Sequence, residues 1–222
     1  MTDTAKTLTG YLDVKSPYAY LAIEPTRRLA RLTGVRLDWL PYTLDIPSYL
    51  GSAQVDDTGQ VIAQDRTAHQ WRRVRYAYMD VRRYANLRGL TIRGTRKIWD
   101  SSLASIAILW ARQHGSADLL LDQIFPPFWR RELDIEDIGV VTDCLRKTGI
   151  DSAGFAEWAM GAGRALHDSL RAEAEAAGVF GVPWYTWGDE VFWGREALPL
   201  ISHRITGELP DWAPDMGLAP DR

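Results

Sequence analysis

The chain has 222 residues, 46% of them hydrophobic and 25% charged, with a formal net charge of −3. This composition suits one large globular domain, or a small domain that carries an insertion. No run approaches the roughly 18 apolar residues that span a bilayer, and the first ten residues lack the features of a signal peptide, so a cytoplasmic protein without membrane contact is expected. The single cysteine, Cys144, excludes an internal disulfide and an internal dithiol cycle.

The first segment reads as a strand, a helix and a second strand. Residues 8–14 form the strand candidate, and Ser16 with Pro17 matches the preferences of an N-cap and a first helical turn. The helix is predicted to span 17–33 and to end at Gly34. Alternating apolar residues over 35–39 then indicate a half-buried strand, parallel to the first.

The next stretch changes from loop to helix. Residues 44–59 are predicted to be an irregular loop. A helix is expected from residue 65 to Gly89, with apolar side chains three or four residues apart on the face that meets a core. These side chains are Trp71, Val74, Tyr78, Val81 and Ala85.

Further helices are expected over residues 100–177. Asp100 or Ser101 is expected to cap one of them, and Pro126-Pro127 is expected to break or kink the chain. Asp134 is predicted to cap a helix that Gly149 closes. Residues 152–177 form the last helical stretch, which a glycine at 161 or 163 can divide into two helices.

The chain returns to strands near its end. Trp184–Trp187 and Glu190–Trp193 are predicted to pair as a β-hairpin around the turn Gly188-Asp189. A short helix is expected over 195–204, and the proline-containing tail over 207–222 is expected to be irregular.

This order of elements is that of an α/β thioredoxin-like fold with an all-helical domain inserted after the second strand. The predicted domains are 1–44 with 178–206 for the thioredoxin-like part and 60–177 for the insert. In this fold a reactive cysteine occupies the place of Ser16, with a second thiol at Ala19. Any thiol used here must therefore come from outside.

Three short motifs strengthen this interpretation. They are Ser16-Pro17-Tyr18, the segment Gly178 to Pro183, and the segment Phe192 to Leu198. Together they resemble the 2-hydroxychromene-2-carboxylate isomerases and kappa-class glutathione transferases, within the DsbA-like thioredoxin superfamily, over residues 8–204. The resemblance implies that the Val182-Pro183 bond is cis and that Val182 offers its backbone to an extended peptide ligand.

The resemblance also implies a cofactor, glutathione, and assigns its contacts. The Ser16 hydroxyl would contact the sulfur, and Val182 with Pro183 would pair with the cysteinyl backbone. The segment that opens the last helix, with Gly194, Arg195 and Glu196, would hold the γ-glutamyl end. Arg195 departs from the small polar residue that is common in the family, and Glu196 replaces an aspartate.

The function implied is a glutathione-dependent isomerase or transferase that acts on an aromatic, anionic small molecule and forms a homodimer. Ser16 would stabilise the thiolate, because a hydroxyl donor and a helix N-terminus both favour a negative charge. The alternatives are a purely structural N-cap at Ser16 and a non-catalytic thioredoxin-like binding module that lost its redox cysteines. A disulfide oxidoreductase would have to work through Cys144, far from Ser16 in sequence.

Other polar residues receive simpler interpretations. Between Arg66 and Lys97 the chain has ten basic residues and one acid, Asp80, which indicates either a solvated helix face or an attraction for small anions. An isoelectric point near 5.8 and the lack of a recognised motif argue against nucleic acid. Lys15 and Tyr18 flank Ser16 and could assist it, but a solvated lysine and a core or interface tyrosine are the simpler interpretations. Cys144 is expected to be a small buried residue. The four histidines show no metal-ligand spacing, so no metal is expected.

Overall fold

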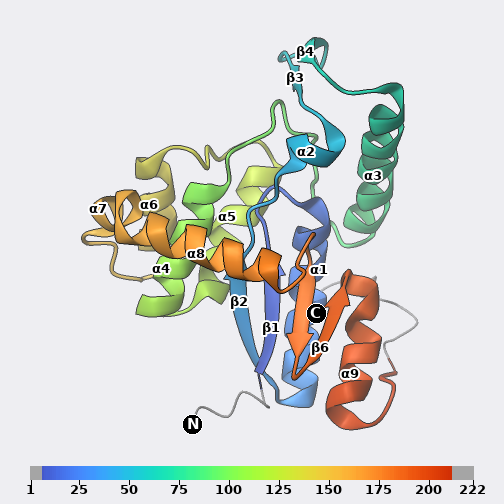
Figure 1. The fold of residues 1–222 in the computed structure, drawn as a ribbon, viewed down its shortest axis with the longest axis vertical. Coiled ribbons are helices and arrows are strands. Elements are labelled where there is room, and N and C mark those ends of the chain that lie inside the picture. Colours follow the sequence, from blue (N-terminus) through green and yellow to red (C-terminus); the bar gives the residue numbers. More distant parts are fainter. Residues whose placement is uncertain (1–6, 212–222) are drawn as a thin grey trace.

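A computed structural model describes residues 7–211, and its centre is a mixed sheet (Figure 1). The strands are β1 (Thr7–Leu12), β2 (Arg36–Pro41), β5 (Trp184–Trp187) and β6 (Glu190–Trp193). They lie in the order β2-β1-β5-β6, with β1 parallel to β2 and antiparallel to β5, and with β5 and β6 joined as a hairpin. The predicted strand, helix, strand unit and the hairpin are both confirmed.

Two helices pack against one face of this sheet. Helix α1 (Pro17–Thr33) starts after the N-cap Ser16 and ends at Gly34, which is left-handed with φ of 69°, as predicted. A short 3-10 turn, Arg195–Ala197, leads into α9 (Leu198–Thr206). A small core between the sheet and these helices contains Leu8, Leu29, Tyr185, Phe192, Leu198 and Ile201.

The segment after β2 differs from the predicted irregular loop. It contains α2 (Ile46–Leu50) and a small hairpin of β3 (Ala53–Val55) and β4 (Val61–Gln64). The Asp56 carboxylate closes the hairpin turn by accepting the backbone N–H groups of Thr58 and Gln60, each at 2.9 Å. All of β4 is exposed, so no buried face marks it as a strand in the sequence.

Helix α3 (Ala68–Leu87) stands apart from the other inserted helices (Figure 1). Val74, Val81 and Ala85 are buried, as the predicted apolar stripe requires. The stripe is not wholly a core face, however, because Trp71 and Tyr78 are only half-buried and line a cavity together with Val74.

Five more helices complete the insert. They are α4 (Ser102–His114), α5 (Ala117–Trp129), α6 (Ile138–Lys147), α7 (Phe155–Met160) and α8 (Ala162–Ala176). In Figure 1, α8 crosses in front of the sheet and α1 lies behind it. The predicted division of the last helical stretch is confirmed, since α7 and α8 meet at Gly161.

Two details of these helices correct the sequence interpretation. Pro126 and Pro127 lie inside α5 instead of breaking the chain there. They occupy its last turn, and the Cys144 thiol donates at 3.7 Å to the Gln123 carbonyl, which the proline at 127 leaves without an intrahelical donor. The cap of α6 is Asp137, whose carboxylate accepts the Val140 N–H, and not Asp134, which binds the N–H of Glu136.

The larger core runs without interruption from the sheet into the insert. It includes Leu12 and Trp39 of the sheet and Ile106 and Phe125 of the inserted helices. Gly10 makes this packing possible, because a Cβ atom there would lie 2.6 Å from the Trp39 ring. None of the helices in residues 7–211 is long and apolar enough to cross a bilayer. The part of the predicted tail beyond residue 211 lies outside the described residues.

Candidate active site

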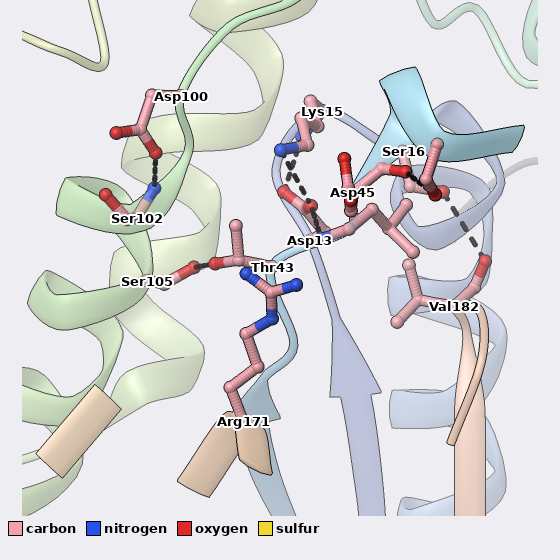
Figure 2. Close-up of polar contacts among 12 residues, drawn as sticks. Asp13, Lys15, Ser16, Thr43, Asp45, Asp100, Ser102, Ser105, Arg171 and Val182 are labelled. Carbon is pink, nitrogen blue, oxygen red and sulfur yellow. Dashed lines mark hydrogen bonds and ion pairs between the residues drawn. The ribbon is translucent and has the colours of Figure 1, made fainter. Parts of the chain in front are cut away.

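The Ser16 hydroxyl sits at the start of α1, where the sheet ends. Its Oγ accepts the Ala19 N–H at 3.2 Å, which makes it a true N-cap, and Pro17 occupies the first turn. Figure 2 shows the same oxygen facing the Val182 carbonyl, to which it donates over 3.5 Å. This donor contact is at the long limit of a hydrogen bond, so the hydroxyl proton is only weakly engaged.

The segment before β5 places a second surface against this hydroxyl. The Val182-Pro183 bond is cis, as the resemblance implied. The Pro183 carbonyl accepts the Gly194 N–H at 2.9 Å, which links this segment to the end of β6. The Val182 N–H donates to no residue in the described part of the chain, so it is open to a ligand's backbone carbonyl.

The residues predicted to hold the γ-glutamyl end differ in exposure, since Arg195 is buried and Glu196 is exposed. Arg195 is 5% exposed, and its guanidinium stacks 3.7 Å from the ring centre of Tyr84 in α3. The Glu196 side chain is 64% exposed, and its carboxylate lies 3.6 Å from Arg195 Nε. Glu196 is therefore the accessible charge of the pair, while Arg195 holds α3 against the thioredoxin-like part.

A large cavity joins all of these residues. Its volume is about 1370 Å³, and Ser16, Val182, Pro183, Gly194, Arg195 and Glu196 all line it. The opposite side consists of α2, α3 and the segment after α3, with Tyr49, Trp71, Tyr76, Tyr78 and Trp99. Phe180 and Trp193 stand beside the cis-proline with ring centres 5.0 Å apart. Aromatic rings therefore line both sides of the cavity, together with Ser16 and Glu196 on one side and arginines of α3 on the other.

Tyr18 connects the two walls. Its hydroxyl donates to the Asp80 carboxylate of α3 at 3.3 Å. Burial, together with the negative charge of Asp80, raises the pKa of Tyr18 to about 12. The phenol is therefore a neutral hydrogen-bond donor at physiological pH, and the single acid of the basic segment is used to hold it.

Only some of the basic residues between Arg66 and Lys97 line the cavity. Those lining it are Arg66, Arg73, Arg75, Arg82, Arg83 and Lys97. Arg66 and Arg82 donate to backbone carbonyls, and Lys97 pairs with Glu136. Arg73 and Arg75 are exposed on α3 and form no ion pair with any residue between 7 and 211, so they can bind an anion at the lowest cost.

Lys15, which flanks Ser16 and lines the cavity, is a functional candidate whose burial the sequence interpretation missed. Lys15 was expected to be solvated, but its side chain is only 6% exposed and lies 3.7 Å from Asp13 Oδ2, while Asp13 is fully buried. The misleading signal was residue type, since lysine is rarely buried. Position was the better signal, because Lys15 lies between the end of β1 and Ser16 and lines the cavity.

The remaining polar candidates lie elsewhere. Cys144 is buried in α6, outside the cavity, and burial raises the pKa of its thiol. His167 is buried and contacts Thr43 Oγ1 at 2.9 Å and Asp168 at 2.8 Å, so it fixes the chain after β2 to α8. Among residues 7–211, no group of His, Cys, Asp or Glu is arranged to hold a metal ion.

Known proteins are similar to this chain over most of its length. A 2-hydroxychromene-2-carboxylate isomerase from Sphingobium xenophagum is 24% identical over 198 residues, which cover 88% of this chain and 96% of that protein. The solved structure of a 2-hydroxychromene-2-carboxylate isomerase is 20% identical, with a TM-score of 0.67 and coverage of 90% and 94%. The cytosolic disulfide reductase DsbM from Pseudomonas aeruginosa with GSH is 16% identical, with a TM-score of 0.59 and coverage of 84% and 88%. The DSBA-like thioredoxin domain model matches residues 7–206, so the chain belongs to this family.

Proposed function

We propose that this protein is a glutathione-dependent isomerase or transferase that acts on an aromatic, anionic small molecule. Two relatives named 2-hydroxychromene-2-carboxylate isomerase support the reaction class, and a relative solved with GSH supports the cofactor. The aromatic and arginine-rich wall of the cavity supports the substrate class. Glutathione, when bound, would supply the nucleophilic sulfur that the chain itself lacks at this position.

The observation that carries the proposal is the state of the Ser16 hydroxyl. Its oxygen is held by the Ala19 N–H, but its proton has only the 3.5 Å contact with the Val182 carbonyl oxygen. A sulfur placed in the cavity beside it would receive that proton as a hydrogen bond. A free thiol has a pKa near 8.5, and a charge-assisted hydrogen bond with a helix N-terminus can lower it by roughly one to two units.

The other residues fit the rest of the cofactor. The unpaired N–H of Val182 suits the cysteinyl backbone carbonyl, in the manner of an added antiparallel strand. The exposed Glu196 carboxylate suits the γ-glutamyl ammonium group. Arg195 acts indirectly, since it is buried against Tyr84 and orients Glu196 at 3.6 Å. On the opposite wall, Arg73 and Arg75 are the candidates to hold the substrate's negative charge.

The first test is binding. Unfolding temperature measured with and without millimolar glutathione should rise, because ligand at 100 times its Kd adds about 2.7 kcal/mol of stability. Reduced dithiothreitol, which has thiols but lacks the peptide, is the control and should leave the temperature unchanged. No shift with glutathione, together with no retention on immobilised glutathione, would favour the non-catalytic binding module.

The second test is turnover of 2-hydroxychromene-2-carboxylate with glutathione. Replacing Ser16 with Ala removes the thiolate donor, so kcat/KM should fall by roughly 10- to 100-fold. Loss of the N-cap should also cost about 0.5–2 kcal/mol of stability, so the assay belongs well below the variant's Tm. Equal activity of the two proteins would show that Ser16 is a structural cap only.

A further inference from the structure

A second cavity of about 790 Å³ adjoins the candidate active site. The two cavities share six lining residues: Lys15, Leu44, Ala53, Lys97, Ile98 and Trp99. The second cavity continues past them to Thr43, Asp45, Asp100 and Arg171, on the side of the sheet edge away from the cis-proline. A ligand whose reactive group lies at Ser16 can therefore extend into it along Lys15.

Lys15 is the central feature of this second cavity. Its ammonium has three hydrogen-bond donors, yet it donates to no residue between 7 and 211 within hydrogen-bond distance. Both oxygens of Asp13 also accept backbone N–H groups: Oδ1 accepts the Lys15 N–H at 3.1 Å and Oδ2 accepts the Leu44 N–H at 2.8 Å. Figure 2 shows the Lys15 amine directed away from Ser16. Because its ion-pair partner Asp13 lies 3.7 Å away, beyond hydrogen-bond distance, the ammonium has donors left for an anionic ligand.

Arg171 adds a second cation from the other side. Its Nε donates to Glu175 at 3.0 Å, and its two terminal nitrogens donate to no residue in the described part of the chain. Figure 2 shows this side chain extending from α8 toward Thr43 and the Asp13–Lys15 pair. Thr43 is itself held by His167 and Ser105, each at 2.9 Å, so the wall between the two cations is fixed.

The overall charge of the lining limits the kind of anion. Lys15, Lys97 and Arg171 are matched in number by Asp45, Asp65 and Asp100. Asp65 and Asp100 each accept a backbone N–H, from Ser52 and Ser102, and Lys97 is paired with Glu136. The Asp45 carboxylate forms no hydrogen bond or ion pair with any residue between 7 and 211, so negative charge also faces this cavity. A lining of mixed charge suits a singly charged carboxylate better than a multiply charged phosphate.

We propose that this second cavity is a subsite for the carboxylate end of the ligand whose reactive part lies at Ser16, with Lys15 and Arg171 as its binding residues. The inference rests on the proposed function. Two sources can supply that carboxylate: the glycyl end of glutathione, or the aromatic substrate. Both present the same chemistry to Lys15, and the experiment separates them.

The variants are Lys15→Met and Arg171→Met, with Lys147→Met as the control, an exposed lysine of α6 outside both cavities. Arg171→Met keeps the test decisive if Lys15→Met folds poorly, because Arg171 is partly exposed and leaves no buried acid unpaired. For each protein, Kd is measured for glutathione and for its glycyl monoethyl ester, and KM for the carboxylated substrate and for its carboxamide.

If the glycyl carboxylate is bound here, wild type and Lys147→Met prefer glutathione to the ester by about tenfold, and both cavity variants lose this preference. If the substrate carboxylate is bound here, wild type and Lys147→Met have a lower KM for the carboxylated substrate than for its carboxamide, and both cavity variants lose this difference. Either result supports the subsite and identifies the source. The proposed subsite would be overturned if the glutathione-to-ester ratio of Kd and the substrate-to-carboxamide ratio of KM both stayed within twofold of wild type in both cavity variants.

A glutathione-independent measurement separates failure of the subsite from failure of the proposed function. Naphthoate and the neutral naphthylmethanol are titrated against the tryptophan fluorescence of the protein, since Trp99 lines both cavities. A preference for naphthoate that both cavity variants lose supports the subsite even when wild type binds no glutathione. Absence of that preference in wild type, when glutathione also fails to bind, overturns both proposals.

Discussion

The two walls of the large cavity are built in different ways. The thioredoxin-like wall presents backbone groups and one hydroxyl at its centre: Ser16 at a helix start, the cis peptide at Val182-Pro183, and Gly194. The rings of Phe180 and Trp193 lie beside them. The α3 wall presents long aromatic and arginine side chains from a helix that stands apart from the rest of the insert (Figure 1). Contacts between the walls include Arg195 with Tyr84, Tyr18 with Asp80, and Arg88 Nη1 with the Leu21 carbonyl at 2.7 Å.

This contrast separates the part of the site that can vary from the part that cannot. Backbone groups fixed by the sheet suit a constant partner such as the proposed cofactor, because their positions depend little on individual side chains. Exposed side chains on a lightly attached helix suit a variable partner, because they can change without loss of the fold. Substitutions at the junction between the walls should therefore affect stability most, and those on the α3 wall least.

The largest effect is expected at the junction. Arg195→Ala removes a buried side chain and its stacking on Tyr84, so the free energy of unfolding should fall by roughly 2–4 kcal/mol. Amide hydrogen exchange in α3 should quicken more than in α1. The control is Arg204→Ala, which removes an exposed pair with Glu190 and should cost less than about 1 kcal/mol. Equal losses in urea unfolding would contradict the role given to Arg195.

The next effect is expected on the thioredoxin-like wall. Gly194 has φ of 85° and ψ of 152°, and a Cβ there would lie 2.6 Å from Glu196 Oε2. Gly194→Ala should therefore cost about 1–3 kcal/mol and weaken glutathione binding by displacing Glu196. Gly207 also has a positive φ, 83°, but open space around it, so Gly207→Ala should leave glutathione affinity unchanged. Equal glutathione Kd values for the two variants would rule out the contact with Glu196.

A smaller effect is expected from Tyr18→Phe, which removes the hydrogen bond to Asp80 and should cost about 0.5–1.5 kcal/mol near neutral pH. The pKa of Tyr18 is raised from 10.0 to about 12, so folding favours the protonated phenol. The protonated Tyr18 phenol therefore contributes its full share of the folding stability below pH 10, and this share is lost as pH rises toward 12. Wild type should therefore lose stability faster than the variant over that interval, and parallel pH profiles would contradict this.

The smallest effect on stability is expected from the α3 wall itself. Arg73→Gln and Arg75→Gln remove exposed charges that form no ion pair within residues 7–211, so the free energy of unfolding should change by less than about 0.5 kcal/mol. The KM of an anionic substrate should nevertheless rise severalfold, and its dependence on salt should weaken. The matched control Arg72→Gln changes an α3 arginine that does not line the cavity and should alter neither quantity. If KM is unchanged in all three arginine variants, Arg73 and Arg75 of α3 do not bind the substrate's negative charge.

Much of the thioredoxin-like wall could be predicted from local sequence. Ser16 with Pro17 specifies a helix start, Gly34 a helix end, and Gly188 a hairpin turn, and each works through backbone preferences of single residues. The family resemblance then pointed to the cis peptide before Pro183, which residue statistics alone would not indicate.

The rest depended on tertiary packing that no local pattern encodes. The β3–β4 hairpin has no buried face, so its sequence looks like a loop. Lys15 is buried because Asp13 and the chain after β2 enclose it, and Arg171 reaches the same cavity from α8, far along the sequence. The second cavity could therefore be found only from the assembled structure.

The proposed role of Ser16 is tested most directly by the pKa of the glutathione thiol when it is bound to the protein. This pKa can be read from the ultraviolet absorbance of the thiolate as a function of pH, in wild type and in Ser16→Ala. We expect a bound pKa roughly one to two units below that of the free thiol in wild type, and a rise of about one unit in the variant. The same bound pKa in both proteins would contradict a thiolate-stabilising Ser16.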